Sequence, residues 1–162
     1  MKTIYLLIGP KGSGKSYIGN LIEKELGISF LNVEPFFMRS EEEANNLDEE
    51  FFEQAWKKVE EEIEKYDKVI LESIGTFDSF KEFLKELEDS YDVKLIKVKS
   101  PLDLCIKRIR DRDKEVHVPM SKETIEKINE LAMKEKYSFN LVINNEKASD
   151  EEIVKAFRGI IR

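Results

Sequence analysis

The chain has 162 residues, 38% of them charged, and its 27 Lys and Arg against 34 Asp and Glu give a net charge of −7. This length predicts one domain over 1–162. The acidic balance argues against nucleic acid or anionic lipid as partners, and no run approaches the roughly 20 apolar residues of a membrane span. The single cysteine, Cys105, excludes an internal disulfide, and its apolar neighbours predict a core thiol. We expect a cytoplasmic monomer or homodimer.

The first predicted element is an apolar strand over 3–8, and a phosphate-binding motif follows it directly. Residues 9–16 read Gly9-Pro10-Lys11-Gly12-Ser13-Gly14-Lys15-Ser16 and fit GxxxxGK[ST] at every specified position. Helical spacing of apolar residues predicts a helix from Tyr17 to Leu26, ended by Gly27. The N–H groups of such a loop and the helix N-terminus bind phosphates. We therefore assign Gly9 to Tyr17 to a nucleotide site, with Lys15 on the β- and γ-phosphates and Ser16 on Mg²⁺.

Four further apolar segments predict strands over 28–33, 68–71, 93–98 and 140–143, and helical segments alternate with them. The alternation predicts an α/β fold with a mostly parallel sheet and helices on both faces. Between the second and third strands, 34–67 carries helical periodicity and is predicted to be a substrate-binding insert, with one long helix beginning at Asp48. Later helices are expected to begin at four signals: a Ser79–Glu82 capping box, Ser100-Pro101, Ser121, and a Ser149–Glu152 capping box.

Two glutamates follow strands at the sheet edge where open α/β folds bind ligands. Glu72 ends the third strand and is a candidate to hold a magnesium-bound water or to accept a proton, and Glu34 follows the second strand and faces the same edge. Beyond Glu34, Phe36 and Arg39 are candidates for the acceptor site, because a guanidinium beside apolar side chains can clamp a carboxylate or phosphate. The alternatives are an exposed strand-end glutamate, core phenylalanines and a solvated arginine.

Cations gather after the fourth strand, from Lys107 to Asp113. Arg108 and Arg112 are four residues apart and share a helix face, and the irregular stretch after them predicts a lid over about 110–120. Arg112 is the candidate for stabilising the transferring phosphoryl group. A solvated helix face is the alternative. The one histidine, His117, lies in this stretch and is assigned no role, because no second histidine or cysteine makes a metal-ligand set with it.

The order of these elements resembles the small P-loop kinases of the nucleoside monophosphate kinase superfamily, shikimate and gluconate kinases included. The resemblance rests on residues 9–16, on the stretch from Ser100 to Arg112, and on Val142-Ile143-Asn144-Asn145 before the last helix. It implies a three-layer fold whose five-stranded parallel sheet has the order 2-3-1-4-5, with ATP and Mg²⁺ as cofactors. It also implies Arg108 near the adenine, Arg112 on the phosphates, and Asn144 to Ala148 beside the base, with Asn145 as a nucleotide-binding residue.

Departures from the resemblance concern the acceptor. Shikimate kinases place two aspartates after the second strand and a glycine triplet after the third, where this chain has Asn32 with Glu34, and Glu72-Ser73-Ile74-Gly75. Adenylate kinases carry several arginines in the insert, where this chain has Arg39 alone. The sequence therefore predicts an ATP- and Mg²⁺-dependent phosphotransferase acting on a small molecule whose identity it does not define. An ATP hydrolase or a nucleotide-binding regulatory module is the alternative, and a polynucleotide kinase is less favoured by the acidic charge.

Overall fold

The computed structural model describes residues 1–112 and 119–161. Its five strands form one parallel sheet in the order β2-β3-β1-β4-β5, which confirms the predicted topology. The strands are β1 (Thr3–Ile8), β2 (Ser29–Phe30), β3 (Lys68–Ser73), β4 (Asp92–Lys99) and β5 (Leu141–Asn144). The helices are α1 (Lys15–Leu26), the 3₁₀ turn η1 (Glu34–Phe37), α2 (Glu41–Ala44), α3 (Glu49–Ile63), α4 (Asp78–Ser90), α5 (Leu102–Asp111), α6 (Lys122–Lys134) and α7 (Asp150–Arg158).

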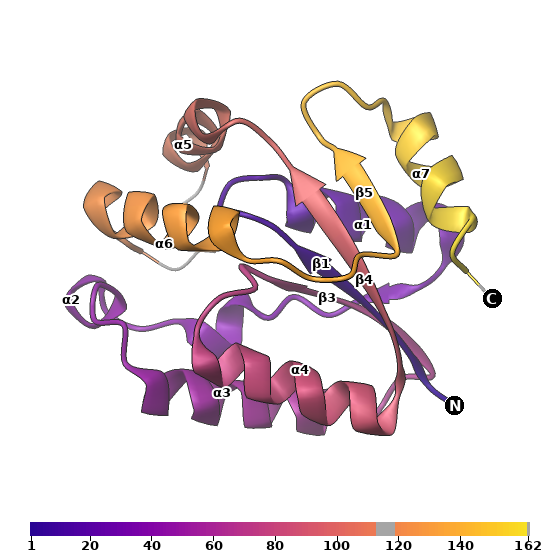
Figure 1. Ribbon diagram of the computed structural model, residues 1–162, viewed down its shortest axis with the longest axis horizontal. Helices are drawn as coiled ribbons and strands as arrows, with labels where there is room; N and C mark the ends of the chain where they lie inside the picture. The colour runs from indigo at the N-terminus through magenta and orange to yellow at the C-terminus, as the bar shows by residue number, and fades with distance from the viewer. Residues whose placement is uncertain (113–118, 162) are drawn as a thin grey trace.

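Helices cover both faces of the sheet, with α1 and α7 on one side and α3 and α4 together on the other (Figure 1). The central strand β1 is buried on both faces because successive side chains of a strand point to opposite sides. Tyr5 and Leu7 pack in the cluster that includes Phe157 of α7, whereas Ile4 and Leu6 pack in the cluster that includes Trp56 of α3. The continuous apolar run of β1 is thereby explained.

The second strand is shorter than the predicted 28–33. Only Ser29 and Phe30 pair with β3, and the N–H of Leu31 adds one bond to the carbonyl of Ile70. Beyond that point Asn32 Oδ1 accepts a hydrogen bond from the N–H of Glu34 (3.1 Å), a local turn that competes with strand pairing. The turn η1 therefore begins at Glu34 and brings this carboxylate to the edge of the sheet.

Three of the predicted helix starts are confirmed, and local signals were sufficient for them. Asp48 caps α3 by accepting from the N–H of Glu50, and Ser149 with Glu152 forms the expected capping box of α7. Ser121 caps α6 as expected. The Ser79–Glu82 capping box is wrong.

The start of α4 is instead capped from another helix. Phe77 is the N-cap residue, with a positive φ of 72°, and its side chain makes no capping bond. The carboxylate of Glu49, at the start of α3, accepts from the N–H groups of Asp78 (3.3 Å) and Ser79 (3.1 Å). A carboxylate at a helix N-terminus satisfies free N–H groups and complements the helix dipole, so this contact takes the place of the box.

The site lies where the parallel strands end. The loop after β1 runs beside β3, since Leu7 pairs with Glu72 and the N–H of Gly9 donates to the carbonyl of Ser73 (3.2 Å). Helices α5 and α6 lie beyond the same end of the sheet (Figure 1). Within the described part of the chain, none of the helices combines the length and apolar character needed to cross a membrane.

Candidate nucleotide-binding and acceptor site

Glycines allow the loop of residues 9–16 to curl tightly against its neighbours. Gly12 and Gly14 have φ of 85° and 96°, values that residues with a Cβ rarely adopt. A Cβ on Gly12 would lie 2.4 Å from the carbonyl oxygen of Cys105 in α5. The loop is also buried, since Ser13 is 0% exposed. The loop conformation therefore requires glycine both for backbone geometry and for space.

Lys15 points back into the loop that it closes. Its Nζ donates to the carbonyls of Gly9 (2.8 Å) and Pro10 (2.9 Å), and its side chain is buried. Burial lowers the pKa of Lys15 to about 8, opposed by the nearby carboxylate of Glu72. A buried ammonium held by two neutral carbonyls can exchange those partners for phosphate oxygens, which carry more negative charge.

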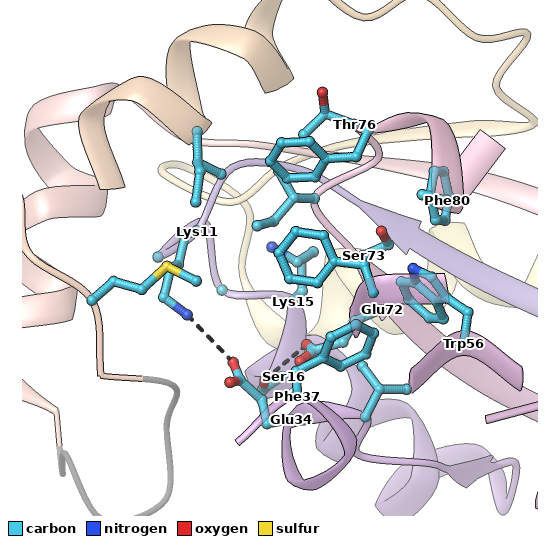
Figure 2. Close-up of a pocket in the computed structure, with 18 of the residues that line it drawn as sticks. Lys11, Lys15, Ser16, Glu34, Phe37, Trp56, Glu72, Ser73, Thr76 and Phe80 are labelled. Carbon is cyan, nitrogen blue, oxygen red and sulfur yellow. Dashed lines mark hydrogen bonds and ion pairs between the residues drawn. The ribbon is translucent and has the colours of Figure 1, made fainter. Parts of the chain in front are cut away.

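Ser16 and Glu72 come from α1 and β3 and meet at the foot of the cavity. Ser16 Oγ donates to Glu72 Oε2 at 2.8 Å, a contact drawn as a dashed line in Figure 2. Glu72 is 5% exposed, and burial raises the pKa of its carboxyl, opposed mainly by Lys15. A hydroxyl and a carboxylate oxygen are the ligand types that Mg²⁺ prefers, so this donor set fits the ion that the P-loop motif implies.

A second pair of charges lies beside the first. Lys11 Nζ is 3.7 Å from Glu34 Oε1, and both side chains are mostly buried (Figure 2). Burial lowers the pKa of Lys11, and Glu34 opposes that shift. Arg112 lines the same cavity, and its Nη2 is buried with no hydrogen-bond partner among residues 1–112 and 119–161. A buried donor without a partner is costly, so this guanidinium is available to an anionic ligand.

Arg108 and Asn145 join the loop to the segment after β5. Arg108 Nη1 donates to the carbonyl of Ser13 (3.1 Å) and to Ser100 Oγ (2.9 Å), and its Nη2 donates to the carbonyl of Asn145 (2.9 Å). Asn145 Nδ2 also donates to the carbonyl of Ser13 (2.9 Å). These hydrogen bonds use N–H groups of both terminal nitrogens of the Arg108 guanidinium. Its place near the adenine, which the resemblance implies, stays a prediction.

Asn129 is a buried polar residue that the sequence analysis did not single out. It lies on α6, is 1% exposed, and pairs with the backbone of Lys11 in both directions. Its Oδ1 accepts from the Lys11 N–H (2.8 Å), and its Nδ2 donates to the Lys11 carbonyl (3.1 Å). The available signal was an asparagine beside Ile128 on the apolar stripe of a predicted helix. This bidentate contact fixes the P-loop to the helix after the predicted lid.

The loop opens into a cavity of about 330 Å³. Its charged lining consists of Lys11, Lys15, Glu34, Glu72, Arg108 and Arg112. The rest of the wall carries no formal charge. It contains Gly12 and Gly14 and the hydroxyl-bearing Ser16, Tyr17, Ser73, Thr76 and Ser79, and its other residues are apolar. These apolar residues come from the position before η1, from the insert, from the segment between β3 and the first turn of α4, and from α6 with the residue before its cap: Val33, Phe37, Phe52, Trp56, Ile74, Phe77, Phe80, Met120 and Ile128.

The two residues predicted for the acceptor site do not line this cavity. The Arg39 guanidinium lies 4.1 Å from the centroid of the Phe51 ring and donates to the carbonyl of Asn46 (2.9 Å). Phe36 packs against the core, and its neighbour Phe37 lines the cavity in its place. In a 3₁₀ turn adjacent residues point about 120° apart, so only one of the pair can face the cavity. Neither side chain is placed to contact a ligand in this cavity, and the acceptor role of Arg39 and Phe36 stays a prediction.

Tyr17 and the lid are two other predicted features. Tyr17 lines the mouth of the cavity, is 54% exposed, and donates its hydroxyl hydrogen to the carboxylate of Asp150 (2.7 Å). The predicted lid, about 110–120, falls largely on 113–118, which lie outside the described residues together with His117. Arg110 is exposed, and Arg112 is half-buried.

Comparison with known proteins identifies the family. The model of the ATPase family associated with various cellular activities (AAA) matches residues 5–144. The chain belongs to this family. A shikimate kinase from Clostridium botulinum is 38% identical to this AAA-family chain over 82 residues, which cover 46% of the chain and 48% of the relative. The chain thus matches about half the length of this curated relative.

Solved structures share the fold of this AAA-family chain at low sequence identity. Shikimate kinase from Acinetobacter baumannii in complex with shikimate has a TM-score of 0.65 at 19% identity, over 99% of this chain and 92% of that one. A gluconokinase from Sinorhizobium meliloti has 0.69 at 15%, over 96% and 88%. Deoxyadenosine kinase from M. mycoides with bound dATP has 0.66 at 17%, over 99% of both. The fold is that of the small P-loop kinases.

Proposed function

We propose that the chain transfers the γ-phosphoryl group of ATP to a hydroxyl group of a small molecule. One observation carries the proposal. Lys11 and Lys15 of the P-loop and the Ser16–Glu72 pair line one part of a cavity whose remaining wall of neutral side chains can surround an acceptor. Simple hydrolysis needs no such second compartment. The relative and the fold neighbours, which are kinases of small molecules by name, support the same function.

The residues at the P-loop end divide into nucleotide-binding and metal-binding groups. Lys15 would exchange its carbonyl partners for β- and γ-phosphate oxygens, and the loop N–H groups from Gly12 onward would bind the phosphates. Ser16 and Glu72 would hold Mg²⁺, directly or through water. When bound, the ion would neutralise charge on the phosphates. Arg112, whose buried Nη2 has no hydrogen-bond partner among the described residues, would stabilise charge on the transferring group.

The transfer step requires an acceptor for one proton. The acceptor hydroxyl oxygen forms a bond to the γ-phosphorus, the bond from that phosphorus to the bridging oxygen breaks, and ADP leaves with the electron pair. The hydroxyl proton then passes to a carboxylate. We assign this role to Glu34, because it lines the cavity in the same turn, η1, as Phe37 of the neutral wall, whereas Glu72 is bonded to Ser16.

A second candidate function is ATP hydrolysis, which the matching family of ATPases favours. The two functions differ in what stimulates turnover. We would measure ADP release with ATP and Mg²⁺ alone and then with a panel of sugars, sugar acids, nucleosides and small alcohols. Product analysis by mass spectrometry would follow each positive result. Phosphotransfer requires acceptor-dependent ADP release with a phosphorylated product, whereas release that no acceptor changes would make the chain a hydrolase.

A further inference from the structure

The cavity is divided by polarity, and the division bears on the identity of the acceptor. Each charged side chain that lines the cavity either belongs to the P-loop or interacts with it through a hydrogen bond, an ion pair or its charge. Glu34 pairs with Lys11, and Glu72 bonds Ser16. Arg108 bonds the loop carbonyls, and, in addition to burial, the charge of the nearby Arg112 lowers the pKa of Lys11 and of Lys15. Within the described residues, the remainder of the lining carries no formal charge.

An acceptor with a carboxylate or phosphate on its body would fit this wall poorly. Once the acceptor's hydroxyl faced the P-loop, such a group would lie among aromatic side chains, where the described residues place no cation to pair with it. Burying an unpaired charge in apolar surroundings is strongly unfavourable. Arg39, the one arginine of the insert, is turned away onto Phe51 and donates to the Asn46 carbonyl.

The aromatic side chains instead form a rigid, ring-lined surface. Trp56 stacks on Phe83 at 4.5 Å between centroids, which holds the indole in place from behind. Phe37 meets Trp56 edge-on at 4.8 Å, and Phe52 lies 5.3 Å from Phe77. In Figure 2, Phe37, Trp56 and Phe80 surround the side of the cavity away from Lys11. Flat rings are the ligand groups that pack best against such a surface, through stacked and edge-on contacts.

One hydroxyl in this wall lacks a partner. Ser79 is 6% exposed, lines the cavity, and its Oγ has no hydrogen-bond partner among the described residues. The neighbouring hydroxyls are engaged: Thr76 Oγ1 donates to Glu135 (3.3 Å), and Ser73 Oγ accepts from the N–H of Gly75 (3.0 Å). A buried polar atom without a partner is rare in folded proteins, and a ligand heteroatom would satisfy it.

Building on the proposed function, we infer that the acceptor is a neutral compound with a flat heteroatom-bearing ring and a hydroxyl group, rather than a sugar acid or a nucleotide. The ring packs among Phe37, Phe52 and Trp56, a ring heteroatom bonds Ser79, and the hydroxyl reaches Glu34 at the P-loop end. Nucleosides and hydroxymethyl-substituted pyridines or pyrimidines share this chemistry. The small cavity, near the lower limit for ligand sites, favours an acceptor of this size.

Trp56 supplies a binding assay that does not depend on turnover, because it is the single tryptophan of the chain. With the nucleotide site filled by ADP and Mg²⁺, the intrinsic fluorescence would be titrated with four nucleosides, two hydroxymethyl heterocycles, shikimate and gluconate. We expect saturable quenching by at least one neutral ring compound and none by the two acids. The nucleoside and heterocycle arms separate the two sources of the same chemistry. Absence of quenching by all ring compounds would overturn the inference.

Matched variants test which side chains form the ring site. Phe37→Leu should raise the dissociation constant of the ring compound, whereas Phe36→Leu, the same change on the adjacent residue of η1 that does not line the cavity, should change it far less. Ser79→Ala should weaken binding roughly 2- to 12-fold, the range for one hydrogen bond. Ser90→Ala, on the same helix but exposed, is its control. Equal effects within each pair would contradict the assignment.

The same panel in the ADP-release assay separates this inference from the proposed function. Stimulation by shikimate or gluconate, but by no neutral ring compound, would overturn the inference and leave phosphotransfer standing. Quenching of Trp56 by ring compounds without stimulated ADP release by any compound would uphold the ligand class and overturn phosphotransfer. Stimulation by the ring compound that quenches would support both.

Discussion

The contact between Asn129 and Lys11 makes a demanding prediction, because one side chain holds both backbone polar groups of a P-loop residue. In Asn129→Leu the side chain keeps its branching and its number of heavy atoms, but the Lys11 N–H and carbonyl lose partners at 2.8 and 3.1 Å. Both residues are buried, at 1% and 6% exposure, so water cannot fully replace the amide. Each unsatisfied group costs about 1–3 kcal/mol, and burying leucine in place of the amide returns part of that.

We therefore expect a net loss of about 2–4 kcal/mol in the free energy of unfolding. For a chain of this length that corresponds to a fall of about 5–15 °C in Tm. Because Lys11 is part of the phosphate loop, ATP affinity should fall several-fold as well. Thermal unfolding and isothermal titration with ATP and Mg²⁺ would measure the two effects on the same sample.

Asn140 provides a control in which an amide is lost far from the P-loop. Asn140 lies just before β5 and is exposed, and its Oδ1 accepts from the N–H of Leu95 at 2.8 Å. Asn140→Ala should cost about 0.5–1.5 kcal/mol and leave ATP affinity unchanged. If Asn129→Leu lowered Tm by no more than this control and bound ATP normally, the bidentate contact would have no role in fixing the loop.

Three further predictions concern the cavity. Glu34→Gln should lower kcat by roughly 10² to 10⁴ while nucleotide binding persists. Glu72→Gln should chiefly raise the Mg²⁺ concentration needed for the half-maximal rate. If the rate depended on Mg²⁺ concentration identically in the two variants, this division of roles would be rejected. Arg112→Ala should reduce kcat more than the apparent ATP affinity, and the exposed Arg110→Ala should do little, so equal effects in steady-state kinetics would point to a solvated helix face. Gly12→Ala should abolish ATP binding and lower Tm, because its Cβ would lie 2.4 Å from a carbonyl of α5; normal calorimetric binding would contradict this.

The parts of the fold that could be predicted from the sequence are those set by local patterns. The P-loop, the apolar strands and the caps at Asp48 and Ser149 depend on neighbouring residues, and the structure confirms these elements. The Ser79–Glu82 box failed because Glu49, from another helix, satisfies the same N–H groups. A contact between residues 30 apart along the chain leaves no local signal to compete with an apparent capping box.

The acceptor half of the site could not be predicted for a related reason. Phe52 and Trp56 recur at helical spacing, which predicts that they lie on the buried face of a helix. The spacing does not distinguish a face that packs on the core from one that lines a cavity. Whether Phe36 or Phe37 faces the cavity depends on the short turn η1. The sequence predicted a longer second strand directly before Glu34 and gave no sign of this turn. Arg39 was predicted to contact substrate because its guanidinium follows apolar side chains, but in the structure this guanidinium lies over the half-buried ring of Phe51.

The burial of charge at the P-loop end has a consequence for stability as well as for binding. Lys15, 8% exposed, contacts two neutral carbonyls, and its pKa is lowered to about 8 mainly by burial. A charge that burial disfavours in the free protein destabilises the fold until an anion arrives. We therefore expect Lys15→Met to abolish ADP release while leaving the nucleotide-free Tm equal or higher. ATP with Mg²⁺ should raise the Tm of the unsubstituted chain but not that of the variant. A clear fall in the nucleotide-free Tm of Lys15→Met would show that the two carbonyl bonds outweigh the cost of burial, and the lysine would then be a structural residue of the loop as well as a ligand-binding one.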